Sequence, residues 1–89
     1  MPFVYIVECS DGSFYTGWSV DVEARVKVHN AGRGARYTRM HRPVKLVYSE
    51  EFETRSGALK REAEIKKLVK KDKESLIFQN EWRNPTDRV

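Results

Sequence analysis

Two runs of β-branched and aromatic residues flank the turn sequence SDG near the N-terminus, and this pair constrains the fold more than any other feature. The runs are FVYIVEC, residues 3–9, and SFYTGWS, residues 13–19. Such residues favour extended backbone, and Asp-Gly is a strong signal for a tight reversal between two strands. The sequence therefore predicts an antiparallel hairpin, with Tyr5 on one strand and Tyr15 on the other.

The type of turn decides where the two tyrosines point. A two-residue type I′ turn would direct Tyr5 and Tyr15 to opposite faces of the sheet. A three-residue turn with Gly12 in the left-handed conformation would pair Tyr5 with Gly17 and put both phenols on one face. Gly17 would then leave open space across from the Tyr5 ring, as a substrate pocket requires. The Asp-Gly sequence suits both turns, so the register stays open here.

The segment after the hairpin predicts a helix and then a loop. A helix is expected over residues 21–31, with Ser19 or Asp21 as its N-cap and Gly32 just beyond its end. Residues 32–43 then read as a basic loop.

The second half of the chain predicts one strand and two helices. A third strand begins after Pro43, where apolar and polar residues alternate. A long helix is expected over residues 55–71 with Thr54 as its N-cap, and Asp72 is a candidate cap for a short helix that follows.

This element order indicates an α+β fold, ββαβαα, in which helices flank a small three-stranded antiparallel sheet. The first helix lets the third strand cross over and join the far side of the first, which gives the strand order 2-1-3. We expect one domain over residues 1–80 and a polar tail over residues 81–89, in which Trp82 is a candidate to pack back.

Positive charge is concentrated in one segment. The chain has a net charge of +4, but residues 1–24 contain no Lys or Arg and residues 25–45 contain no acid. An arginine-rich segment suits phosphate groups, because a guanidinium can bind them bidentately, although a loop that only improves solubility is the alternative. The bases of this segment are Arg25, Lys27, Arg33, Arg36, Arg39, Arg42 and Lys45.

Cys9 is the single cysteine, so it has no disulfide partner within the chain, and the longest apolar run is five residues. Neither a secretory signal nor a bilayer-spanning segment is indicated. We therefore expect a cytoplasmic protein that does not enter the membrane.

Polar residues break the apolar faces of both main helices. Glu62 falls in or beside the stripe of Ala58, Ile65 and Val69, and a buried carboxylate needs a cationic partner, a metal ion or a path to the rim. Arg25 and His29, one turn apart on the first helix, lie on the flank that should face the sheet.

These residues resemble the motifs of the GIY-YIG endonuclease superfamily. Its two signature motifs correspond to FVY, residues 3–5, and YTG, residues 15–17, with Phe3 in place of the first motif's Gly and Thr16 in place of the second motif's Ile. The resemblance covers residues 3–78 and is nearest to the small stand-alone, single-domain bacterial branch. The Asn that many members carry after the glutamate has no clear counterpart here.

The resemblance implies a set of catalytic roles. Glu62 would hold one Mg²⁺ or Mn²⁺ ion, and Arg25 would bind the scissile phosphate. Tyr5 would act as general base, with Tyr15 positioning the water and His29 assisting proton transfer. Because a free phenol titrates near 10, Arg25 and the metal would have to lower the pKa of Tyr5.

The predicted function is a divalent-metal-dependent endonuclease acting on nucleic acid, DNA rather than RNA, with little sequence specificity. A targeting protein is a second candidate partner, and the oligomeric state is left open. The backbone-binding residues would be Arg33, Arg36, Arg39, Arg42 and Lys45. One alternative is a nucleic-acid-binding module with a vestigial site. Another is a small interaction protein whose tyrosines only fill the core.

Overall fold

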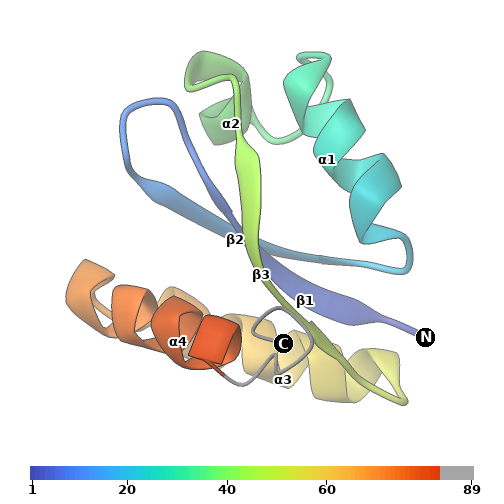
Figure 1. Cartoon of the computed structure of the whole chain (residues 1–89). Coiled ribbons are helices and arrows are strands. Elements are labelled where there is room, and N and C mark those ends of the chain that lie inside the picture. The colour runs from blue at the N-terminus through green and yellow to red at the C-terminus, as the bar shows by residue number, and fades with distance from the viewer. Residues whose placement is uncertain (83–89) are drawn as a thin grey trace.

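The structure, a computed structural model, describes residues 1–82 and the side chains as far as Gln79. A three-stranded antiparallel sheet lies between two layers of helices (Figure 1). The strand order is β2-β1-β3, so the predicted α+β fold and its strand order are confirmed. The elements are β1 (Phe3–Glu8), β2 (Phe14–Ser19), α1 (Val22–Asn30), α2 (Arg36–Met40), β3 (Lys45–Glu51), α3 (Arg55–Lys66) and α4 (Lys70–Trp82).

The hairpin between β1 and β2 has the three-residue turn. Gly12 has φ 85°, its N–H donates to the Cys9 carbonyl at 2.9 Å, and the Cys9 N–H donates to the Ser13 carbonyl at 2.8 Å. Tyr5 is consequently paired with Gly17 in the register. Both tyrosines therefore lie on the same face of the sheet, because side chains alternate along a strand.

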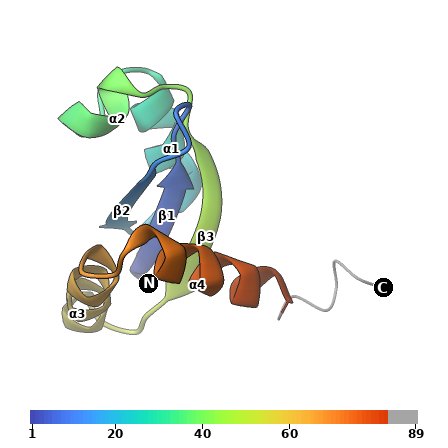
Figure 2. The same ribbon diagram turned by 90° about the vertical axis from the view of Figure 1, so that its left-hand side faces the viewer.

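Each face of the sheet has its own core. On one face α3 packs beneath β1 and β2, and α4 contacts β3. On the other face lie α1 and α2, so the two helical layers are separated by the sheet (Figure 2). The α3-side core contains Val4, Ile6, Tyr48, Ala58 and Ile65, and the α1-side core contains Tyr5, Val7, Cys9, Val22 and Val44.

The first helix begins where the sequence predicted. Asp21 is the N-cap of α1, and its carboxylate accepts a hydrogen bond from the Ala24 N–H at 3.1 Å. The expectation that residues 32–43 form only a loop is wrong, because they contain α2. The Thr38 hydroxyl and the Arg39 N–H both donate to the Ala35 carbonyl, which closes one helical turn around a fully buried Thr38.

The single long helix expected over residues 55–71 is also wrong. The predicted Thr54 cap begins α3, but the helix ends at Lys66, where i to i+3 hydrogen bonds close its last turn. Val69 therefore leaves the buried stripe and is 64% exposed. Asp72 lies in the first turn of α4 and does not cap it.

The C-terminal part of α4 extends past residue 80 and reaches Trp82. The division into a domain of residues 1–80 and a tail of residues 81–89 stays a prediction, and the Trp82 side chain and residues 83–89 lie outside the described part. Over the described residues, no helix has the length and apolar character needed to cross a bilayer.

Candidate active site at the outer edge of the sheet

The Tyr5 side chain crosses over the outer strand β2 at Gly17. Its ring is 1% exposed, and a Cβ atom added at Gly17 would lie only 2.7 Å from the Tyr5 hydroxyl oxygen. The open space expected across from the ring is therefore absent, because the phenol itself fills it. Glycine at this position instead allows the hydroxyl to approach the edge of the sheet.

His29 lies directly above this hydroxyl. Its Nε2 atom is 2.8 Å from the Tyr5 oxygen and its Nδ1 atom is 2.8 Å from Oγ1 of Thr38. The imidazole is 2% exposed, and the Tyr15 ring meets it edge-on at 5.4 Å between centroids. The helix α1 thus delivers a buried, fully hydrogen-bonded histidine to the two tyrosines of the hairpin.

Arg25, one turn earlier on α1, is exposed, yet its guanidinium is near enough to act on both groups. Its positive charge and hydrogen bonding lower the pKa of Tyr5, and its charge lowers the pKa of His29. An exposed guanidinium beside these two groups is also suited to bind an incoming phosphate.

Glu62 approaches from the opposite face of the sheet, on α3. Its side chain is 16% exposed, and its negative charge raises the pKa of Tyr5, so the two groups share one electrostatic environment. Oε2 forms an ion pair of 3.1 Å with Lys66, which supplies the cationic partner that a largely buried carboxylate needs.

Burial dominates the proton affinities of the site. It raises the pKa of Tyr5 to about 12, with a further increase from Tyr15, and the opposing effect of Arg25 is smaller. Arg25 therefore acts in the expected direction but does not lower the pKa of this phenol below its usual value. Burial is also the main cause of the lowered pKa of His29. At neutral pH the pair consists of a protonated phenol and an imidazole whose neutral form is favoured.

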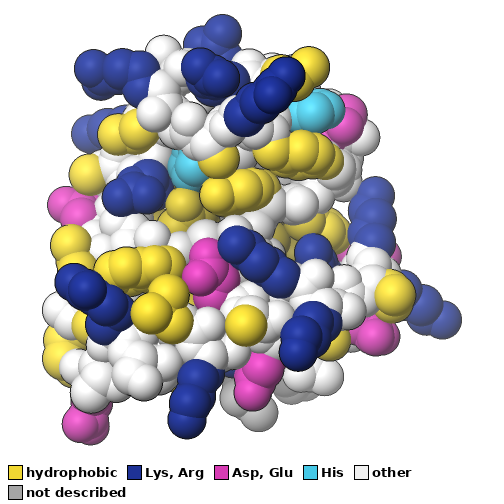
Figure 3. Space-filling model, turned by 180° about the vertical axis from the view of Figure 1, so that it is seen from behind, with side chains coloured by type: hydrophobic (Ala, Val, Ile, Leu, Met, Phe, Trp, Pro, Cys, Tyr) yellow, Lys and Arg dark blue, Asp and Glu magenta, His cyan; other side chains and the backbone are white. Residues whose placement is uncertain are grey.

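Several basic side chains lie at the end of the molecule formed by α1 and α2 (upper part of Figure 3), and others are spread over the lower half of the same view. Arg42 folds back, donates to the carbonyls of Arg39 and Asn30 at 3.3 Å, and so ties the ends of α1 and α2 together. Lys45 starts β3 and lines a groove with Glu74 and Phe78 of α4, apart from the arginines.

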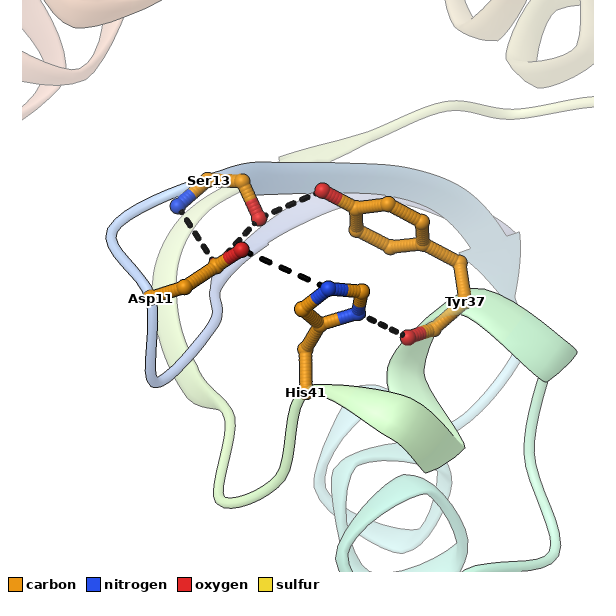
Figure 4. A network of polar contacts seen from close by, with 4 residues as sticks. All are labelled: Asp11, Ser13, Tyr37 and His41. Carbon is orange, nitrogen blue, oxygen red and sulfur yellow. Dashed lines mark hydrogen bonds and ion pairs between the residues drawn. The ribbon is translucent and has the colours of Figure 1, made fainter.

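A polar network fixes α2 against the hairpin (Figure 4). The Tyr37 hydroxyl donates to the Ser13 hydroxyl at 2.5 Å, which donates to Asp11 at 2.6 Å. His41 bridges the two elements, with Nε2 3.4 Å from the Asp11 carboxylate and Nδ1 2.7 Å from the Tyr37 carbonyl. The hydrogen bonds from Ser13, first through its hydroxyl, and the nearby His41 lower the pKa of Asp11.

This network brings a third tyrosine to the site. The Tyr37 ring is nearly parallel to Tyr15, with 6.4 Å between their centroids, and stacks on His41 at 4.4 Å. Sequence reasoning missed this arrangement, although the i, i+4 spacing of Tyr37 and His41 is a helical signal inside the expected loop.

The geometry defines a class of protein: a ββα unit with two tyrosines on one sheet face and an Arg-His helix above them. The sequence matches the GIY-YIG catalytic domain over residues 1–75, and the chain belongs to this family. The family is one of nucleases that act on nucleic acid and generally use a divalent metal ion.

Within this family, the chain is similar to small UPF0213 proteins. It is 61% identical over 75 residues to UPF0213 proteins of Staphylococcus aureus strains Mu3 and Mu50, covering 84% of this chain and 92% of each relative. The solution structure of UPF0213 protein BH0048 from Bacillus halodurans is 44% identical, with a TM-score of 0.58 over 89% of this chain and 85% of that one.

Protein EF2693 of E. faecalis, also solved by NMR, is 43% identical, with a TM-score of 0.62 over 92% of this chain and 88% of that one. The resemblance stated from the motifs is thereby confirmed at the level of family and fold.

Proposed function

We propose that this protein is a divalent-metal-dependent endonuclease that hydrolyses phosphodiester bonds, in DNA rather than RNA, with little intrinsic sequence specificity. One observation supports the proposal: the Tyr5 hydroxyl lies at Gly17 in a hydrogen bond with His29, and the charges of Arg25 and Glu62, from opposite faces of the sheet, both act on it. A tyrosine that served only the core would need neither the buried histidine nor the two charges.

The chemistry of Glu62 fits a hard divalent cation. A single carboxylate suits Mg²⁺ or Mn²⁺, which keep several water ligands and readily share phosphate oxygens. Among the described residues no group of three or more His, Cys, Asp or Glu side chains is placed to hold a metal, so Glu62 would hold the ion with at most one further side chain of these types. The bound ion would supply polarisation of a non-bridging phosphate oxygen.

The proton chemistry belongs to Tyr5 and His29. The Tyr5 oxygen would accept a proton from the attacking water while its own proton passes to Nε2 of His29, 2.8 Å away. This coupled transfer removes the need for a free phenolate, which the raised pKa of Tyr5 makes rare at neutral pH. Tyr15 would help to place the water, and Arg25 would hold the phosphate and stabilise its developing charge.

The basic end of the molecule would bind the nucleic-acid backbone without reading sequence. The residues assigned to this role are Arg33, Arg36, Arg39 and Arg42 at that end, together with Lys45 at the groove between β3 and α4. Each substitution that removes one phosphate-binding charge should reduce the slope of log affinity against log salt by about 0.9. Because Arg42 also binds backbone carbonyls, its replacement should cost stability as well as affinity.

A second function is favoured by the Glu62–Lys66 ion pair. The ammonium group of Lys66 already neutralises the carboxylate at 3.1 Å. A protein in which this pair persisted would bind nucleic acid without cutting it, as a module with a vestigial nuclease site.

A nicking assay separates the two functions. Plasmid, branched DNA and RNA are incubated with Mg²⁺ or Mn²⁺ and either wild type, Glu62→Ala or Glu64→Ala. Glu64 is the matched control, because it lies two residues away on α3 and pairs with Arg61. Metal-dependent cleavage that disappears only in Glu62→Ala supports the endonuclease. Salt-sensitive binding without cleavage in any variant would replace it with the binding module.

A further inference from the structure

We propose that Thr38 is a positioning residue that fixes the tautomer of His29, so that Nε2 is the bare nitrogen facing Tyr5. The effect on rate rests on the proposed nuclease function, whereas the tautomer is a property of the folded chain. Thr38 lies on α2, nine residues after His29, and the two side chains meet in the interior with 0% and 2% exposure.

The direction of each hydrogen bond follows from counting protons. A threonine hydroxyl has one hydrogen, and Thr38 donates it to the Ala35 carbonyl at 2.8 Å. In its hydrogen bond with His29, the same oxygen must therefore accept, so Nδ1 of the imidazole carries the hydrogen. The neutral ring then has no hydrogen on Nε2, and the Tyr5 hydroxyl must donate to it.

The backbone at Gly34 lies close against the imidazole of His29. A Cβ atom added at Gly34 would overlap Nδ1 of His29 and lie 2.9 Å from both Cγ and Cε1. The loop before α2 thus packs directly against the ring. A flipped ring would put carbon atoms in place of both nitrogens and would lose the hydrogen bonds to Tyr5 and Thr38. Gly34 and Thr38 together form the wall that holds His29.

Loss of the Thr38 acceptor would change the chemistry of the neighbouring Tyr5 phenol. In the other neutral tautomer the hydrogen sits on Nε2 and points toward the Tyr5 oxygen, so the Tyr5 proton has no acceptor. In the proposed tautomer, an O–H bond of the attacking water would break, its proton would join the Tyr5 oxygen, and the Tyr5 proton would move to Nε2 of His29. The Nδ1–H group of His29 would keep its hydrogen bond to Oγ1 of Thr38 throughout, and this hydrogen bond would stabilise the imidazolium that forms.

Histidine ¹⁵N labelling of the full-length chain tests the placement without any activity. Long-range ¹⁵N–¹H spectra distinguish a nitrogen that carries hydrogen from a bare one, and His41→Gln assigns the His29 signals because the chain has two histidines. Wild type and Thr38→Ser should show hydrogen on Nδ1. Thr38→Val, which keeps the shape but removes the acceptor, should move hydrogen toward Nε2.

Kinetics of the same variants test the consequence. We expect Thr38→Val to lower kcat by roughly tenfold to a hundredfold with little change in KM, and Thr38→Ser to restore it. A wild-type spectrum with hydrogen on Nε2, or a Thr38→Val spectrum identical to wild type, overturns the inference. If Thr38→Val fails to fold, wild type and Thr38→Ser still decide the tautomer. Absence of cleavage by wild type would overturn the nuclease function and leave the tautomer result standing.

Discussion

Replacing Gly17 with alanine is the sharpest test of how the site is built. The new Cβ atom would lie 2.7 Å from the hydroxyl oxygen and 2.9 Å from Cζ of Tyr5. Ordinary van der Waals separation begins near 3.4 Å, so the phenol must retreat by about 0.7 Å. The 2.8 Å hydrogen bond to His29 cannot survive this shift with its present geometry.

Two effects contribute to the loss of folding free energy in Gly17→Ala. Overpacking a buried position costs about 1–3 kcal/mol, and the broken hydrogen bond adds about 0.5–1.5 kcal/mol. We therefore expect Gly17→Ala to lower the free energy of unfolding by roughly 2–4 kcal/mol in urea titrations. Because a displacement near 1 Å can cost a hundredfold in rate, cleavage should fall by about that factor.

Two controls make the result specific. Gly57→Ala, in the first turn of α3, would place its Cβ 3.3 Å from the Phe52 ring, so a small adjustment opposes the helix preference of alanine and stability should change by less than about 1 kcal/mol. In a Tyr5→Phe background the closest atom is gone, so Gly17→Ala should cost less there than in wild type. Wild-type stability and cleavage in the single variant Gly17→Ala would refute the reasoning.

Other predictions concern buried polar groups. The Thr16 hydroxyl is buried without a hydrogen-bond partner among the described residues, so Thr16→Val should raise stability by about 1 kcal/mol, or roughly 4–8 °C in melting temperature; unchanged melting would contradict this. The near-ultraviolet phenolate absorbance of Tyr5 can be isolated by subtracting the titration of Tyr5→Phe from that of wild type. Because the pKa of Tyr5 is raised to about 12, this difference should titrate near 12, not 10. Because the folded state retains this proton longer than the unfolded state, stability should fall as pH rises from 10 toward 12, and less so in Tyr5→Phe; equal alkaline stability would count against the burial effect.

The sequence predicted most of the sheet, the first helix and the start of α3 correctly. Alternating residues, the Asp-Gly turn and the Asp21 and Thr54 caps are local signals, and the observed strands and helix starts follow them. The turn type was not predictable, because Asp-Gly suits both alternatives. In the structure, the turn type is defined by the backbone hydrogen bond from the Cys9 N–H to the Ser13 carbonyl and by the left-handed conformation of Gly12.

The parts that sequence reasoning missed depend on tertiary interactions. The short helix α2 is held by Thr38 against His29 and by Tyr37 against the hairpin, and neither interaction has a local pattern. The break after Lys66 lacks the Gly or Pro that usually marks a helix end, so the continuous helix pattern was misleading. The convergence of Tyr5, His29 and Glu62 was suggested by polar residues on the inward faces of the two helices, and the family resemblance supplied their roles. Their separation along the chain gives no distance.

The placement of these groups around β2 restricts how the sheet can be extended. The described sheet has two outer strands, β2 and β3. A strand from another molecule added along β2 would run beside Gly17 and separate the Tyr5 hydroxyl from the approach of a substrate. Dimerisation by strand addition would therefore be compatible with an accessible site only along β3, where Lys45, Ser49 and Glu51 are exposed.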